Sequence, residues 1–243
     1  MSKNRIILGT VALGTAALVG LGSAAAFAAT PGAGTTTLPG IQAKAAAAIT
    51  LRVHDLNAAI SKVNGTGLLG SSSASLASYL QADIAPLQAL GTKIAGDTTV
   101  ATAQADASTI FTSYRVLALV LPAARLAATA DGIDATTIPD LTTLSAKAAS
   151  HVNPSNRTAV QPLIDDLNAQ IQSATNGTAA VATTLLGYTP SQWNANHDLL
   201  TASRGSVQAA NGNITKARDD MQQIRHILTS TAPAPSTTPT TSA

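Results

Sequence analysis

The chain has 243 residues, no cysteine and a formal net charge of +2. This length can bury a substantial core in one large or two small domains, and the lack of cysteine excludes a disulfide framework, a thiolate metal site and a cysteine nucleophile. Two of the fourteen basic residues lie within the first five positions, so the rest of the chain is close to neutral, which excludes the phosphate-neutralising surface that nucleic-acid binding requires.

The first 28 residues have the pattern of a secretory signal peptide. Lys3 and Arg5 precede an apolar run over residues 6–21, and small residues then lead to Ala28. The run is short for a bilayer span and contains three glycines, so the pattern favours cleavage between Ala28 and Ala29 over retention as a membrane anchor. We therefore expect a secreted, extracytoplasmic protein with no membrane span after cleavage.

Two segments flank the central part of the chain. Residues 29–40 are rich in Gly, Thr and Pro, and residues 230–243 are almost wholly Ser, Thr, Pro and Ala, a composition typical of disordered linkers and tails. Between them, over residues 41–229, apolar residues recur at helical spacing, and no run alternates as a half-buried strand does. The sequence predicts an all-α domain, an antiparallel bundle of five or six helices.

Three helices are expected in the first half of this domain. The first covers residues 41–63, with an apolar stripe opposite a polar face that includes Arg52. The second begins near residues 71–73 and should kink at Pro86, and the third follows a cap signal at residues 97–99 and runs through Leu121. The third helix is apolar all round near its end, which predicts a place at the centre of the bundle.

A loop is expected at residues 131–134, with Gly132 after the end of a helix. A short fourth helix should then open at Thr137 and Pro139, and a fifth should run from residue 153 to 186. Residues 189–192 form a capping-box sequence, Thr-Pro-Ser-Gln, which predicts one more helix start beside Trp193.

The last helix has the clearest heptad pattern of the chain. An apolar stripe of this kind packs either within a bundle or against a second chain, and we favour packing within the bundle of a monomer. The stripe consists of Leu200, Val207, Ile214, Met221 and Leu228, with Ala210, Ala217 and Ile224 between them.

No pattern predicts a catalytic, cofactor or metal site. Residues 65–70 match G-x-G-x-x-G, but an amphipathic helix precedes them where a dinucleotide site needs a strand. The four histidines are not paired at ligand spacing, and the adjacent carboxylates at 165–166 and 219–220 are typical of a solvated helix face. A glycosidase-like pair of aspartates from separate helices stays open as an alternative.

One ligand hypothesis rests on Tyr114, Arg115 and Arg125, which surround Pro122. A proline in a helix removes one backbone hydrogen bond and kinks the helix, here leaving the Ala118 carbonyl without its donor. The kink could form an apolar pocket in which an arginine meets an anionic ligand. The alternative, which we favour, is a kinked core helix whose arginines extend to solvent or pair with aspartates.

The same region carries a resemblance to a known family. The stretches Leu80-Gln81-Ala82-Asp83-Ile84 and Leu119-Val120-Leu121-Pro122, with residues 92–95 and 114–116 between them, resemble an uncharacterised family of secreted, Ala-rich helical proteins from actinobacteria. The similarity covers the central and C-terminal two-thirds. It implies export and a helical bundle, and it carries no catalytic residue.

The sequence therefore predicts a secreted, non-enzymatic helical protein, associated with the cell envelope or released, with an interaction or structural role. A cell-wall polymer or another envelope protein would be its partner. The alternative is an extracytoplasmic carrier that holds an apolar or anionic small ligand between its helices. An extracellular hydrolase is the third possibility.

Overall fold

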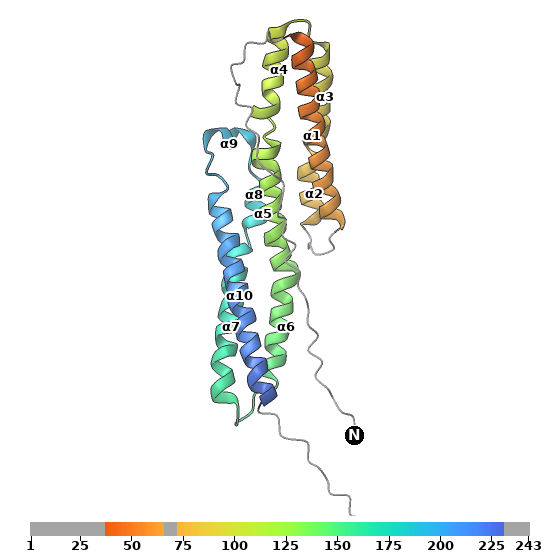
Figure 1. Ribbon diagram of the computed structural model, residues 1–243. Coiled ribbons are helices and arrows are strands. Elements are labelled where there is room, and N and C mark those ends of the chain that lie inside the picture. The colour runs from red at the N-terminus through yellow and green to blue at the C-terminus, as the bar shows by residue number, and fades with distance from the viewer. Residues whose placement is uncertain (1–36, 66–71, 231–243) are drawn as a thin grey trace, which may run out of the picture. The chain divides into compact units, whose positions relative to one another are not determined.

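The computed structural model describes residues 37–65 and 72–230, and Figure 1 shows how their helices are arranged. All of these residues belong to one compact unit, Gly32–Ala243. The predicted signal peptide and its Ala28–Ala29 junction, most of the linker at 29–40 and the tail from residue 231 lie outside the described residues. So does the G-x-G-x-x-G segment beyond Gly65.

Every regular element that the structure describes is a helix, which confirms the predicted all-α bundle. Several helices follow one another with two residues or none between them, and when these are joined the elements group into six long helical runs and the short α9. The elements are α1 (Leu38–Gly65), α2 (Ser73–Gln81), α3 (Ile84–Gly96), α4 (Val100–Thr112), the π-helical η1 (Val116–Val120), α5 (Leu121–Gly132), the π-helical η2 (Ile133–Thr137), α6 (Ile138–Ala149), α7 (Arg157–Thr178), α8 (Val181–Leu186), α9 (Pro190–Ala195) and α10 (Thr201–Ser230).

The helices enclose two clusters of buried aliphatic residues. What we call the first core is built by α1 to α5, α8 and the start of α10; the second core is built by η2, α6, α7 and α10. Buried side chains of the first core include Leu56, Leu76, Leu80, Leu87, Ile110 and Leu119, and those of the second include Leu141, Val160, Ile164, Leu167, Ile214 and Ile224.

Arg52 does not lie on the solvent face of α1, and that prediction was wrong. It lies three residues after Ile49 and four before Leu56, a spacing that puts all three on one face, and only 7% of its surface is exposed. Its guanidinium carbon lies 4.6 Å from the centre of the Phe111 ring, and its Nη1 donates to the Ala48 carbonyl at 2.9 Å. Burial lowers the pKa of Arg52, although Asp55 opposes the shift.

The predicted loop at residues 131–134 is also absent, because the chain is helical without interruption from Val116 to Ala149. Gly132 has ordinary right-handed helical angles, φ −64° and ψ −35°. One residue separates each of the prolines Pro122 and Pro139 from a preceding π-helical turn: the N–H of Leu121 donates to Val116, and that of Ile138 to Ile133. A wider turn relieves the clash that a proline ring makes with the preceding turn, so neither proline ends the helix.

The helices α7 and α10 form the most extensive pair in the fold and lie side by side (Figure 1). The predicted heptad stripe of α10 is buried within the chain, where Val207, Ile214 and Ile224 are at most 6% exposed. The predicted fifth helix is interrupted by a turn at residues 179–180, between α7 and α8. The stripe on α10 is therefore covered by the chain's own helices, as we expected.

The short α9 starts with the predicted capping box. The N–H of Gln192 donates to the Thr189 hydroxyl at 3.3 Å, and the N–H of Thr189 donates to the Gln192 side chain at 2.9 Å. Pro190 occupies the first helical turn, and Tyr188 and Trp193 pack against the first core. The sequence thus specified this helix start locally.

One helical stretch within the described residues, Val100–Ala149, is apolar and long enough to cross a membrane by composition alone, with mean hydropathy 1.6. Half of the tested window is buried inside the fold, and the core helix of a soluble protein meets the same criterion. The stretch therefore carries no conclusion about a membrane.

Candidate functional site

Two short helix breaks lie close to the first core. The first lies between α2 and α3, at residues 82–83, and interrupts the predicted second helix shortly before Pro86, where the sequence predicts a kink. Pro86 is the third residue of α3 and has no N–H to donate to the Ala82 carbonyl, and the helix is interrupted just before it. Asp83 stands at this break as the residue before α3, and its side chain makes no capping hydrogen bond.

Asp83 is half-buried, and burial raises the pKa of its carboxyl to about 6. One turn earlier, the hydroxyl of Tyr79 is buried and has no hydrogen-bond partner within the described structure. Burial, and then the charge of Asp83, raise the pKa of Tyr79 to about 12. The first break thus places an ionisable carboxyl near a phenol whose hydroxyl has no hydrogen-bond partner in the described structure.

The second break lies between α4 and η1, at Tyr114 and Arg115. Arg115 has φ 49° and ψ 29°, the only left-handed conformation of a non-glycine residue in the described part of the chain. Its carbonyl accepts the N–H groups of Ala118, Leu119 and Val120 at 3.1, 2.8 and 3.2 Å, which starts the π-helical turn. A residue in this conformation costs free energy, so the contacts on either side must hold it.

An electrostatic interaction between Tyr114 and Asp83 links the two breaks. Burial raises the pKa of its hydroxyl, and the charge of Asp83 raises it further. The charge of Asp83 therefore raises the pKa of Tyr79, in the same helical run, and that of Tyr114, in the second break. We call these three residues the break cluster. A half-buried carboxyl between two phenols can hold or release a proton near neutral pH, and it repels anions when it is ionised.

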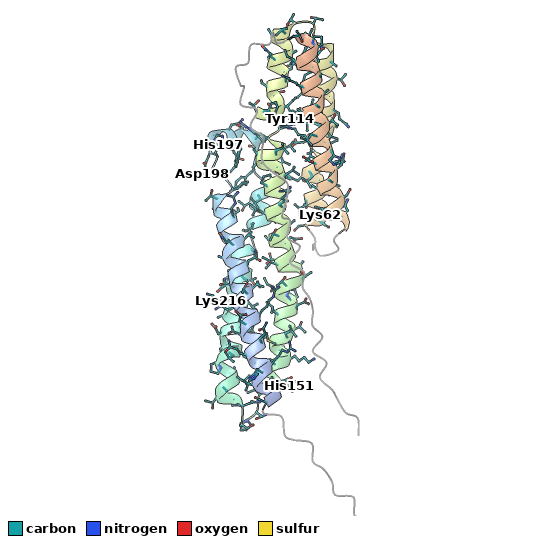
Figure 2. All side chains as sticks on the ribbon, viewed as in Figure 1. Lys62, Tyr114, His151, His197, Asp198 and Lys216 are labelled. Carbon is teal, nitrogen blue, oxygen red and sulfur yellow. The ribbon has the colours of Figure 1, made fainter. Side chains whose placement is uncertain are left out.

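Asn194 of α9 fixes the second break. Its side-chain oxygen accepts from Arg115 Nε at 2.6 Å, and its amide nitrogen donates to the Thr112 carbonyl at 2.9 Å. One side chain thereby caps the end of α4 and holds the arginine that follows. Figure 2 labels Tyr114 at this break and His197 just after α9, where the His197 ring lies 5.6 Å from that of Trp193.

The structure brings Tyr114 and Arg115 together but not Arg125. Arg125 lies ten residues further along, in α5, which is about 15 Å along a helix axis. It is half-buried, whereas Nε of Arg115 is engaged by Asn194. The three residues of the ligand hypothesis therefore do not form one site.

Sequence reasoning missed Tyr79, Asp83 and Asn194. Pro86 indicated a break, and short polar residues such as aspartate are common at the residue before a helix. No local signal pointed to Asn194, because its two partners lie about 80 residues away.

No group of three or more potential metal ligands exists among the residues that the structure describes. The four histidines, His54, His151, His197 and His226, are all exposed and belong to different elements or the turns beside them. Each is thus an exposed side chain, and the four do not gather at one place in the sequence of elements.

Comparisons of the chain with protein-family models, with curated proteins and with solved structures found no match.

Proposed function

We propose that the protein is exported and acts without enzymatic chemistry, as a helical bundle with an interaction or structural role in the cell envelope or outside the cell. The observation that carries the proposal is the N-terminal pattern, a basic start, an apolar run and a small-residue junction at Ala28–Ala29. The Thr/Pro-rich residues 230–243 add to it, because such tails stay extended and suit passage through a polymer layer.

The chemistry at the breaks supports a non-enzymatic role. The most polar contact there, Arg115 with Asn194, ties α9 to the end of α4, so these groups serve the fold. The break cluster offers one carboxyl and two phenols whose pKa values are all raised, which makes the phenols poorer nucleophiles at neutral pH.

Co-sedimentation with purified cell-wall sacculi tests the proposal. Residues 29–243 and a matched form that ends at Thr229 would be pelleted with sacculi and, as a control, without them. Pelleting of both forms places the binding surface on the bundle, and pelleting of the longer form alone assigns it to the tail. If neither form pellets, the proposed association with the cell wall is wrong, and the remaining proposal is a protein released from the cell.

A second candidate, a carrier of a small apolar ligand between the helices, is favoured by one observation, the buried and unpartnered hydroxyl of Tyr79. A ligand with one acceptor group would satisfy it. Native mass spectrometry of protein purified from its own host should then show a reproducible adduct that the Tyr79→Phe variant loses. Bare protein in both samples would contradict the carrier.

A further inference from the structure

Positive charge collects at the end of the fold where α6 finishes, α7 begins and α10 finishes. These three helices contact one another, and residues 141–164 and 221–230, which build this end, contain no acidic residue. Figure 2 labels His151 here, beside the last turns of α10. Three side chains carry a fixed positive charge, and two histidines add charge when they are protonated. All five are exposed, and we call them the basic end: Lys147, His151, Arg157, Arg225 and His226.

No acidic group compensates this charge within the described structure. None of the five forms an ion pair with another described residue, whereas Lys93 of α3 pairs with Asp106 of α4 at 2.8 Å. On each helix of the basic end, the nearest aspartate lies five to eight residues from the fixed cation, about 8–12 Å along a helix axis. Exposed charges at such distances are largely screened, because the Debye length is about 8 Å at physiological ionic strength. These aspartates are Asp140, Asp165 and the buried Asp220.

The helix dipoles account for only part of this charge. Lys147 lies in the last turn of α6, where the partial negative charge of a helix C-terminus favours a cation. Arg225 lies before the last turn of α10, beyond the reach of that effect. Arg157 is the first residue of α7, where the partial positive charge of a helix N-terminus disfavours a cation. Two of the three fixed charges are therefore not explained by the stability of their own helices.

The rest of this surface is polar. None of the large hydrophobic side chains that the structure shows exposed, Leu51, Val100 and Phe111, lies at the basic end. A lipid surface is recognised by roughly four to eight basic residues or by an additional apolar anchor, and neither is present among the described residues of this end. Uncharged hydroxyl and amide side chains are exposed beside the cations instead: Ser150, Asn153, Ser155, Thr158, Gln222 and Thr229.

We propose that the basic end binds an acidic polysaccharide through the carboxylate groups of its sugars. This names the partner for the proposed interaction role outside the cell, and it rests on that role. Guanidinium groups bind carboxylates with two parallel hydrogen bonds, and hydroxyl and amide groups can bind the sugar hydroxyls. Each ion pair is exposed and therefore weak, but a polymer presents many carboxylates close together, so a broken contact forms again readily.

Binding to immobilised polygalacturonate tests the proposal. The protein consisting of residues 29–243 would be measured at 50 and 500 mM NaCl, with methyl-esterified polygalacturonate as the uncharged control. We expect binding that weakens at least tenfold at the higher salt concentration and is absent from the ester. No binding at 50 mM NaCl, or equal binding to the ester, would overturn the proposal. Tighter binding to phosphatidylglycerol vesicles than to the polysaccharide would also overturn it, in favour of a membrane surface.

Two triple variants with the same net charge assign the binding surface. The first removes the fixed cations of the basic end: Lys147→Gln, Arg157→Gln and Arg225→Gln. The matched control removes three exposed cations elsewhere: Lys44→Gln, Lys62→Gln and Arg204→Gln. We expect the first to bind about tenfold more weakly than the wild type, because each exposed ion pair contributes roughly a two- to threefold factor, and the control to bind as the wild type does. Equal losses in the two variants, or no loss in the first, would contradict the proposal.

The sacculus experiment separates this proposal from the proposed function. If the first triple variant pellets with sacculi as fully as the wild type, association with the wall holds but the basic end is not its site. If the wild type binds polygalacturonate through the basic end but does not pellet with sacculi, the basic end is a polysaccharide site and association with the wall is wrong.

Discussion

The first and second cores are built from the same aliphatic side chains, but the helices around them differ in continuity. Around the second core, α7 and α10 run for 22 and 30 residues. Around the first core, α1 runs for 28 residues, but breaks at residues 82–83 and 113–115 interrupt the helices that follow it. All three tyrosines of the chain and its single tryptophan pack against the first core.

The difference between the two cores shows which contacts each kind of helix needs. A heptad stripe lets long helices pack without specific polar contacts, whereas a break exposes backbone groups that a side chain must satisfy. Asn194 does so at the second break, and no capping side chain does so at Asp83. We therefore expect a new charge in the second core to destabilise the fold strongly, and the break region to be sensitive to loss of single polar side chains.

The largest effect is expected from Ile214→Asp, because Ile214 is 3% exposed in the second core. An unpaired carboxylate buried there should lower the free energy of unfolding by more than about 4 kcal/mol, measured by urea denaturation. Thr215→Asp, at the exposed neighbouring position, is the matched control and should change it little. A folded Ile214→Asp protein that only loses self-association would mean that the stripe packs between chains.

The break region is tested by Asn194→Ala. The change removes the acceptor of Arg115 Nε and the donor to the Thr112 carbonyl, and we expect a loss of about 1–2 kcal/mol in the free energy of unfolding. Hydrogen exchange should increase in α9 and at residues 113–120 but not in α7. Ser191→Ala, on the exposed side of α9, should leave both measurements unchanged.

The pH dependence of the break region follows from Asp83. Its folded pKa of about 6 lies above the ordinary value of 3.8, so its stabilising contribution is complete below pH 3.8 and is lost between pH 3.8 and 6. Solvent screens this half-buried group, so we expect about 1 kcal/mol rather than the ~3 kcal/mol of a fully buried one. Asp83→Asn should therefore unfold at higher urea than the wild type at pH 7 but not at pH 4. A benefit of equal size at both pH values would exclude this origin.

The smallest effect is expected from Thr189→Ala, which removes the capping box of α9. Because this helix is short and exposed, we expect a loss of about 0.5 kcal/mol, at the low end for a capping residue. Increased exchange limited to the amides of residues 190–195 would agree with this, and a loss as large as that of Asn194→Ala would not.

The features that the sequence predicted correctly are those set by near neighbours. The heptad stripe of α10, the capping box at Thr189 and the break near Pro86 each depend on residues within one or two turns. The π-helical turns before Pro122 and Pro139 were not predictable in this way, because a proline inside a helical pattern usually kinks or ends the helix.

The features that sequence reasoning missed depend on distant partners. Arg52 is buried because Phe111, 59 positions later, covers its guanidinium, and Asp220 is buried because α7 lies across it. Both charged residues looked like members of a solvated face, since a helix pattern shows the direction of a side chain but not what packs over it. The same holds for Asn194 and the break cluster.

The most direct test of the central claim, that this chain is an exported helical protein, is cell fractionation combined with intact mass measurement of the untagged protein from its own host. The account predicts protein in the envelope or the medium whose first residue is Ala29. Full-length protein that begins at Met1 and stays in the cytoplasm would contradict it.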